Sequence, residues 1–187
     1  MKLREICYVA IAAALLSALA PVSIPIGIVP ITLATLVIYI IGCIYTPWTA
    51  AFAVLLYIVL GAMGLPVFSG YTGGIAKLLG PTGGFIIGYL PAVFVQSLIV
   101  SHFKDRKIMY IVSIIVSTII IYGFGLSWFL ISTNGKYDFG QAMMACVYPF
   151  IPGDLVKLVL SVSLAYKLRP LLERFQNTEK FRKSRSC

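Results

Sequence analysis

Six long apolar runs constrain the fold of this chain more than any other feature. A helix that crosses the hydrocarbon core of a bilayer needs about 20 apolar residues, with about 17 to 25 the usual range. Hydrophobic residues make up 60% of the sequence and charged residues 11%, whereas soluble domains are roughly half apolar and a quarter charged. We therefore predict an all-α membrane protein with a bundle of six transmembrane helices, near Ile6–Ala20, Ile31–Tyr45, Thr49–Gly64, Phe85–Phe103, Ile108–Ser132 and Ala142–Tyr166.

The domain organisation is simple, because no polar stretch is long enough to form a separate soluble domain. Residues 1–170 are predicted to form a single six-helix transmembrane domain that binds a small molecule, and residues 171–187 a basic cytoplasmic tail. The first three runs are short for a membrane crossing. They either extend into the flanking proline segments or form thin helices inside the bundle.

Basic residues gather at alternate ends of the runs. With six spans both termini lie on one side, and only Lys77 and Lys136 lie on the other. Because cytoplasmic loops carry an excess of Lys and Arg, we predict a multi-pass protein of the cell membrane with both termini in the cytoplasm. The net charge is +9, but the basic residues do not share one folded face, so nucleic acid is not an expected partner. The basic residues of the predicted cytoplasmic side are Lys2, Arg4, Lys104, Arg106, Lys107, Lys167, Arg169, Arg174, Lys180, Arg182, Lys183 and Arg185.

Three loops are then predicted outside, at residues 21–30, 65–84 and 133–141. The first two are apolar and rich in Pro and Gly, although an exposed loop should be polar. Irregular backbone near a membrane is buried in protein or lines a cavity. We therefore predict that these loops form a lid over an outward-facing ligand pocket; the alternative is that they are plain interfacial loops.

Asp154 and Lys157 are two ionisable residues inside the sixth apolar run. A charged residue at the centre of a membrane helix costs about 2.5 to 3.5 kcal/mol on insertion scales, so such residues usually face a cavity and serve function. Their spacing of three places them on one helix face. Pro149 and Pro152 disfavour a continuous helix, so a regular helix is predicted to restart near Pro152 with Asp154 in its first turn. The alternative is a self-neutralising pair that only orders the bundle.

Three alanines on the first run, Ala10, Ala14 and Ala18, form a small-residue stripe. Such stripes permit close helix contact, either within the bundle or against another subunit. No catalytic group is expected: Gly80–Gly84 lacks the GK[ST] ending of an ATP-binding loop, and His102 lies at a helix end beside charged residues. The four cysteines are not paired in sequence, so no metal site is predicted.

Four ordered motifs resemble those of the biotin-binding S component of energy-coupling factor transporters, the BioY family. They are Val29–Leu33, Gly64–Gly70, Gly80–Phe85 and Pro149–Lys157, and the resemblance covers nearly the whole chain. One departure is Ala34, where the family pattern leads us to expect Gln, so a polar contact is lost or supplied elsewhere.

This resemblance implies a biotin-capture subunit in the membrane of a prokaryote, without a cofactor and not an enzyme. Its implied partners are biotin, a transmembrane coupling subunit that meets the alanine stripe, two cytoplasmic ABC-type ATPases and membrane lipid. Nearest alternatives are an S component for another small vitamin and, more distantly, a membrane enzyme. It is left open whether Asp154 and Lys157 meet the ureido ring, the carboxylate or both. The implied ligand-binding residues are Asp154, Lys157, Thr32, Phe68, Tyr71, Gly73, Gly74 and Phe85.

Overall fold

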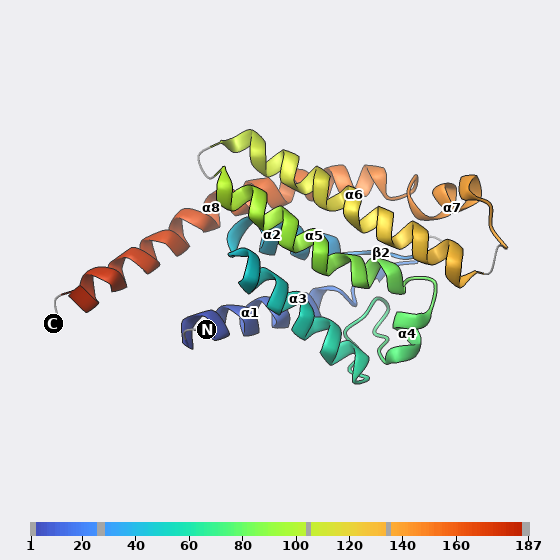
Figure 1. The fold of residues 1–187 in the computed structure, drawn as a ribbon, viewed down its shortest axis with the longest axis horizontal. Coiled ribbons are helices and arrows are strands. Elements are labelled where there is room, and N and C mark those ends of the chain that lie inside the picture. Colours follow the sequence, from blue (N-terminus) through green and yellow to red (C-terminus); the bar gives the residue numbers. More distant parts are fainter. Residues whose placement is uncertain (1–2, 26–28, 104–105, 134–135, 185–187) are drawn as a thin grey trace.

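A computed structural model describes residues 3–25, 29–103, 106–133 and 136–184 of the chain. Parts of the predicted loops at 21–30 and 133–141, and of the tail, lie outside these residues. So do Lys2, Lys104 and Arg185 from the predicted cytoplasmic set. Within the described ranges most of the chain is helical (Figure 1).

The predicted bundle of six helices is confirmed, and the sixth is broken in two. The bundle comprises α1 (Leu3–Leu19), α2 (Ala34–Ile44), α3 (Pro47–Ala62), α5 (Gly83–His102), α6 (Lys107–Ser132) and the pair α7 (Phe139–Cys146) and α8 (Ile151–Ser184). Three further elements were not predicted from the sequence: β1 (Ser23–Ile24), β2 (Ile31–Thr32) and α4 (Ile75–Leu79). Helix α8 continues through residues 171–184 of the predicted tail.

Helix α2 is short because it lies inside the bundle. At 1.5 Å per residue its 11 residues span about 17 Å, well below the hydrocarbon thickness of about 30 Å. Most of its side chains are buried, and it packs against α5, α8, α1 and α3. Of the two possibilities for the short runs, α2 therefore follows the second, a thin helix in the core.

Span length differs among the remaining helices. In the described part of the chain, α5 and residues Ile108–Ser132 of α6 are each long and apolar enough to cross a membrane. Helices α7 and α8 meet the same test only as a pair, bent by 47°. The break covers residues 147–150, which include Pro149. Helix α8 begins at Ile151 with Asp154 in its first turn, as predicted. A proline near a helix start is tolerated because the first N–H groups have no partner within the helix.

One end of the bundle is closed by irregular segments, and we call it the roof end. Strands β1 and β2 pair antiparallel there, and Gly70 donates its N–H to the carbonyl of Pro21 at 3.0 Å. The loop before α4 turns sharply at Gly74, whose φ of +94° is open to glycine at little cost. These bonds hold the first two predicted loops together at the roof end.

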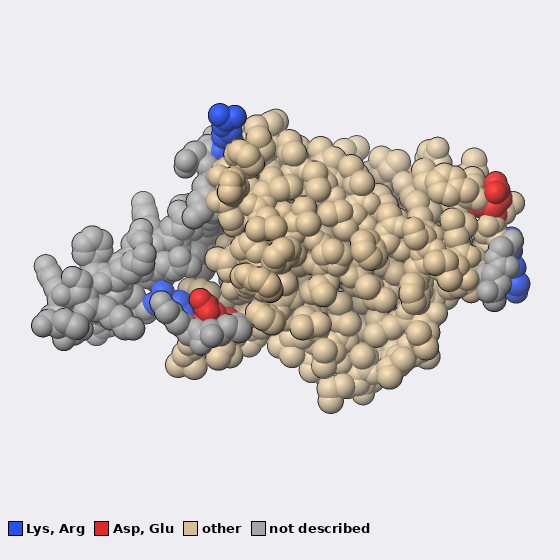
Figure 2. Space-filling view, viewed as in Figure 1, with Lys and Arg blue, Asp and Glu red and all other residues tan. Residues whose placement is uncertain are grey.

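Charged side chains are absent from the middle of the surface shown in Figure 2. On the face in Figure 2, Lys, Arg, Asp and Glu lie at the two ends and a broad uncharged belt separates them. Many large apolar side chains on the outside of the bundle are exposed, for example Ile119 of α6 at 65% and Val159 of α8 at 62%. Such a belt suits contact with lipid hydrocarbon.

Candidate ligand-binding site

A cavity lies between α2, α5, α6 and α8, beneath the segments of the roof end. Its apolar lining consists of Ala20, Val29, Pro30, Ala34, Phe85, Ile86, Ile121 and Phe150. Its polar lining consists of Thr32, Thr35, Tyr39, Tyr57, Ser69, Thr82, Tyr89, Thr118, Tyr122, Asp154 and Lys157.

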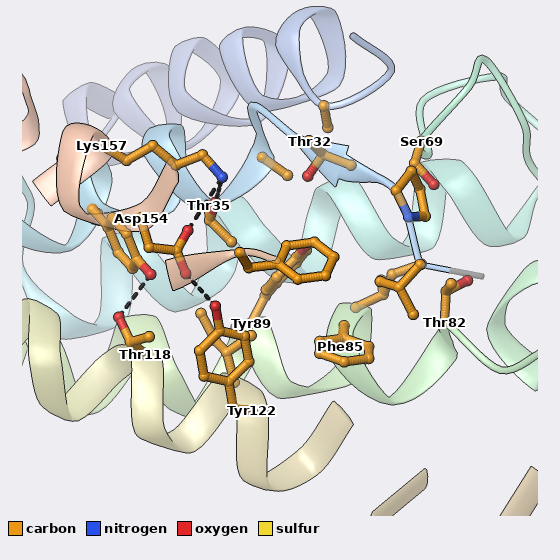
Figure 3. A pocket seen from close by; sticks show the side chains of 18 of the residues that line it. Thr32, Thr35, Ser69, Thr82, Phe85, Tyr89, Thr118, Tyr122, Asp154 and Lys157 are labelled. Carbon is orange, nitrogen blue, oxygen red and sulfur yellow. Dashed lines mark hydrogen bonds and ion pairs between the residues drawn. The ribbon is translucent and has the colours of Figure 1, made fainter. Parts of the chain in front are cut away.

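The two charged residues form an ion pair at one end of this cavity (Figure 3). The Lys157 ammonium lies 3.3 Å from Asp154 Oδ1 and donates a hydrogen bond of 2.8 Å to Thr35 Oγ1. Lys157 is only 7% exposed. A buried ammonium is costly unless it is paired and hydrogen-bonded, and here Asp154 and Thr35 satisfy both conditions.

Helix α6 supplies a second set of partners. Tyr122 donates its hydroxyl hydrogen to Asp154 Oδ2, so both carboxylate oxygens are engaged. One turn earlier, Thr118 donates to the carbonyl of Ile114 at 2.8 Å. Its hydroxyl has only one hydrogen, so the 2.7 Å bond between Tyr39 and Thr118 is donated by Tyr39. The charged pair therefore lies in a site whose hydroxyl groups are already oriented.

The other end of the cavity carries uncharged hydroxyl groups. Ser69 comes from the loop between α3 and α4, and Thr82 precedes α5. Figure 3 places both across the cavity from Asp154 and Lys157, with Phe85 between the two groups. The cavity thus has a charged end and an opposite end at which Ser69 and Thr82 carry uncharged hydroxyl groups. Among the described residues no three His, Cys, Asp or Glu side chains come together as a metal site requires.

Comparison with known proteins identifies the family. The sequence model of the BioY family matches residues 1–174. The chain belongs to the BioY family. A protein of Pyrococcus horikoshii named probable biotin transporter BioY is 37% identical over 169 residues, covering 90% of this chain and 98% of that protein. Biotin transporter BioY2 of Lactococcus lactis is 35% identical, covering 85% and 86%.

A solved structure supports the same assignment. The crystal structure of an S component for biotin from an ECF-type ABC transporter matches with a TM-score of 0.83 and 28% identity, over 90% of this chain and 92% of that one. The predicted resemblance to the BioY family is thus confirmed. Its proteins are prokaryotic membrane transporters and not enzymes.

The predicted ligand-binding residues of this BioY protein divide into two groups. Four of them, Thr32, Phe85, Asp154 and Lys157, line the cavity. The other four, from the loop before α4, do not line it in this structure and remain predictions. Phe68 is fully buried and packs edge-on against Tyr57 with ring centroids 5.5 Å apart.

The remaining loop residues shape the roof end. Tyr71 is 68% exposed and has a φ of +57°, in the turn closed by the bridge between Phe68 and Thr72. Gly73 lies so close to Leu65 that a Cβ atom would overlap its carbonyl oxygen, and Gly74 has the positive φ given above. From this loop it is Ser69, not a predicted residue, that reaches the cavity.

Sequence reasoning missed the hydroxyl-bearing residues of the helices, namely Thr35, Tyr39, Tyr57, Tyr89, Thr118 and Tyr122. A signal was present, since Thr35 and Tyr39 are four residues apart and so are Thr118 and Tyr122. Each pair lies on one helix face within a run that is otherwise strongly apolar. Tyrosine and threonine are common in membrane helices, however, and neither spacing by itself indicates a pocket.

Two further predictions concern alanines. Ala10, Ala14 and Ala18 are all exposed, whereas Ala12, Ala13 and Leu16 face the bundle. Of the two possibilities for the alanine stripe, contact within the bundle is therefore contradicted by the structure, and contact with another subunit stays a prediction. Ala34, where Gln was expected, is buried at the cavity wall, and the neighbouring Thr35 hydroxyl provides the polar group on this turn of α2.

Proposed function

We propose that this chain is the biotin-capture S component of an ECF-type transporter. The observation that carries the proposal is the Asp154–Lys157 ion pair, which lies at one end of a cavity whose far end carries the uncharged hydroxyl groups of Ser69 and Thr82. Biotin has a matching layout, with a neutral cyclic urea, an apolar ring and chain, and a terminal carboxylate. The names of the BioY relatives and the solved S component support this ligand.

The charged pair suits the ureido ring. An ammonium has three N–H donors, and Lys157 uses two of them for Thr35 and Asp154. The third is left for the ureido oxygen. A carboxylate has about four acceptor sites, and Asp154 uses one on each oxygen. It can therefore also accept a ureido N–H, and the pair presents a donor beside an acceptor.

The ligand carboxylate belongs at the opposite end in this proposal. A carboxylate placed on Lys157 would lie beside the Asp154 anion, and like charges repel strongly where water is scarce. Ser69 and Thr82 offer hydroxyl donors without that repulsion. Phe85 lies between the two ends (Figure 3), and Ile86 and Phe150 also line the cavity, as apolar side chains do in most small-molecule sites.

Transport also requires an energy source and partners. We extend the proposal to a transmembrane coupling subunit that docks on the exposed stripe of Ala10, Ala14 and Ala18, and to two cytoplasmic ABC-type ATPases. Small residues allow a partner helix to approach closely. The excess of Lys and Arg on the side of the termini supports a cytoplasmic location for both termini, and hence a cavity that opens outside the cell.

Binding by the purified chain tests the proposal. Biotin is titrated calorimetrically against the detergent-purified, monodisperse protein, next to a panel of other small vitamins. Tight one-to-one binding of biotin alone is the expected result. Binding of a different vitamin in preference to biotin would reassign the ligand within the same class of transporter subunit. Chemical change of a bound ligand would instead indicate an enzyme.

A further inference from the structure

Four large apolar side chains form an exposed patch beside the roof end. Met63 directly follows α3 and Leu65 lies in the same loop, whereas Ile75 and Leu79 lie four residues apart on one face of α4. Their exposed fractions are 77%, 47%, 62% and 65%. We call this set the α4 patch. Because the exposure of apolar surface to water is unfavourable, a covering surface is expected.

The α4 patch continues a lipid-facing stripe of α3. Phe52, Leu55, Val59 and Met63 recur every three or four residues, and all are exposed. Helix α4 packs beside the end of α3 (Figure 1). On the face in Figure 2 no charged side chain interrupts the surface over these two helices. The patch is thus the end of the surface that α3 turns toward hydrocarbon.

Helix α6 gives the depth of this patch in the bilayer. It directly follows Arg106, and from Ile108 to Trp128 it rises about 30 Å at 1.5 Å per residue, which equals the hydrocarbon thickness of about 30 Å. Trp128 therefore lies at the boundary, where tryptophan is enriched. It donates its indole N–H to the carbonyl of Gly80 at 3.1 Å. Gly80 ends α4, so α4 lies at the same level.

We propose that the α4 patch is seated in the headgroup and acyl-chain boundary of the leaflet at the roof end, with phospholipid acyl chains as its occupant. Lys77, half-buried in the middle of α4, carries a charge that can reach lipid phosphates while its stem stays in apolar surroundings. The segment that supplies Ser69 and Thr82 to the cavity is thereby held on the membrane surface. This seat does not depend on which ligand the cavity binds.

Nitroxide labels on the protein in phosphatidylcholine nanodiscs test this position of the α4 patch in the membrane. Cysteines replace Ile75 and Leu79 one at a time, in a chain carrying Cys7→Ser and Cys187→Ser; Cys43 and Cys146 are buried. Collisions with oxygen, which enters lipid, and with a water-soluble nickel chelate give the depth of each label. Ile119→Cys, about 17 Å along α6 from Ile108, serves as the deep control and Lys136→Cys as the aqueous control.

If the α4 patch lies in this boundary, labels at 75 and 79 collide mainly with oxygen and lie within about 10 Å of the phosphate level, on the hydrocarbon side. Nickel-dominated collisions like those at Lys136 would place the patch in water and overturn the proposal. Low collision rates with both reagents would mean that protein covers the patch, and would overturn it as well.

Discussion

Replacing Lys157 with methionine removes the ammonium and nearly preserves the volume of the side chain. Two hydrogen bonds disappear, 2.8 Å to Thr35 and 3.3 Å to Asp154, and the donor assigned to the ligand is lost. A hydrogen bond to a charged group contributes about 1.5 to 3 kcal/mol. We therefore expect Lys157→Met to weaken biotin binding about ten- to a hundredfold.

The same change acts on stability, because among the described residues the Asp154 carboxylate then keeps only the hydrogen bond from Tyr122. Removing one member of a buried ion pair costs about 3 to 5 kcal/mol, enough to mimic lost binding through lost folding. Calorimetric affinity must therefore be measured together with monodispersity and thermal stability. Lys136→Met, at an exposed lysine of the roof end, is the matched control, and we expect it to retain both affinity and stability.

Two analogues separate the possible roles of Lys157. In 2-iminobiotin a guanidinium can replace the neutral urea, and its positive charge would restore neutrality beside Asp154 in Lys157→Met. That variant should therefore favour 2-iminobiotin relative to biotin, in contrast to the wild type. Biotin methyl ester lacks the carboxylate charge. If Lys157 instead held the carboxylate, the variant would scarcely distinguish the ester from the acid. Wild-type biotin affinity in a well-folded Lys157→Met protein would refute both roles.

Three further changes test other parts of the proposal. Tyr122→Phe removes the hydroxyl that donates to Asp154 Oδ2 and should weaken biotin binding about tenfold, the effect of one hydrogen bond to a charged group. Tyr148→Phe, at an exposed tyrosine, is the control. Equal calorimetric affinities of the two variants for biotin would contradict this role of Tyr122. Ala14→Trp should spare biotin binding and abolish co-purification with the coupling subunit, since Ala14 is exposed and close packing needs a small residue. Normal co-purification of this variant would show that the alanine stripe is not part of the interface. Lys136→Cys should react with impermeant reagents added outside the cell, and labelling only from the cytoplasm would reverse the topology.

The sequence alone determined the helices and the charged residues of the site. An apolar run indicates a membrane-spanning helix directly, because each of its residues contributes separately to the free energy of transfer from water into the bilayer. Asp154 and Lys157 were found for the same reason, since a charge in such a run is costly enough to require a function or a partner. The break before α8 followed from Pro149 and Pro152, whose rings act on the adjacent backbone. All of these effects are local.

Only the tertiary structure decided which residues share the cavity. Lys157 contacts Thr35 across a sequence separation of 122, and Asp154 contacts Tyr122 from another helix. Threonine and tyrosine, unlike the two charged residues, do not stand out in an apolar run. Phe68 was predicted as a ligand contact and the structure buries it against Tyr57, while its neighbour Ser69 lines the cavity. Which side chain of an irregular loop points inward depends on backbone turns and on packing against other helices, and these are set by contacts between distant segments rather than by local sequence.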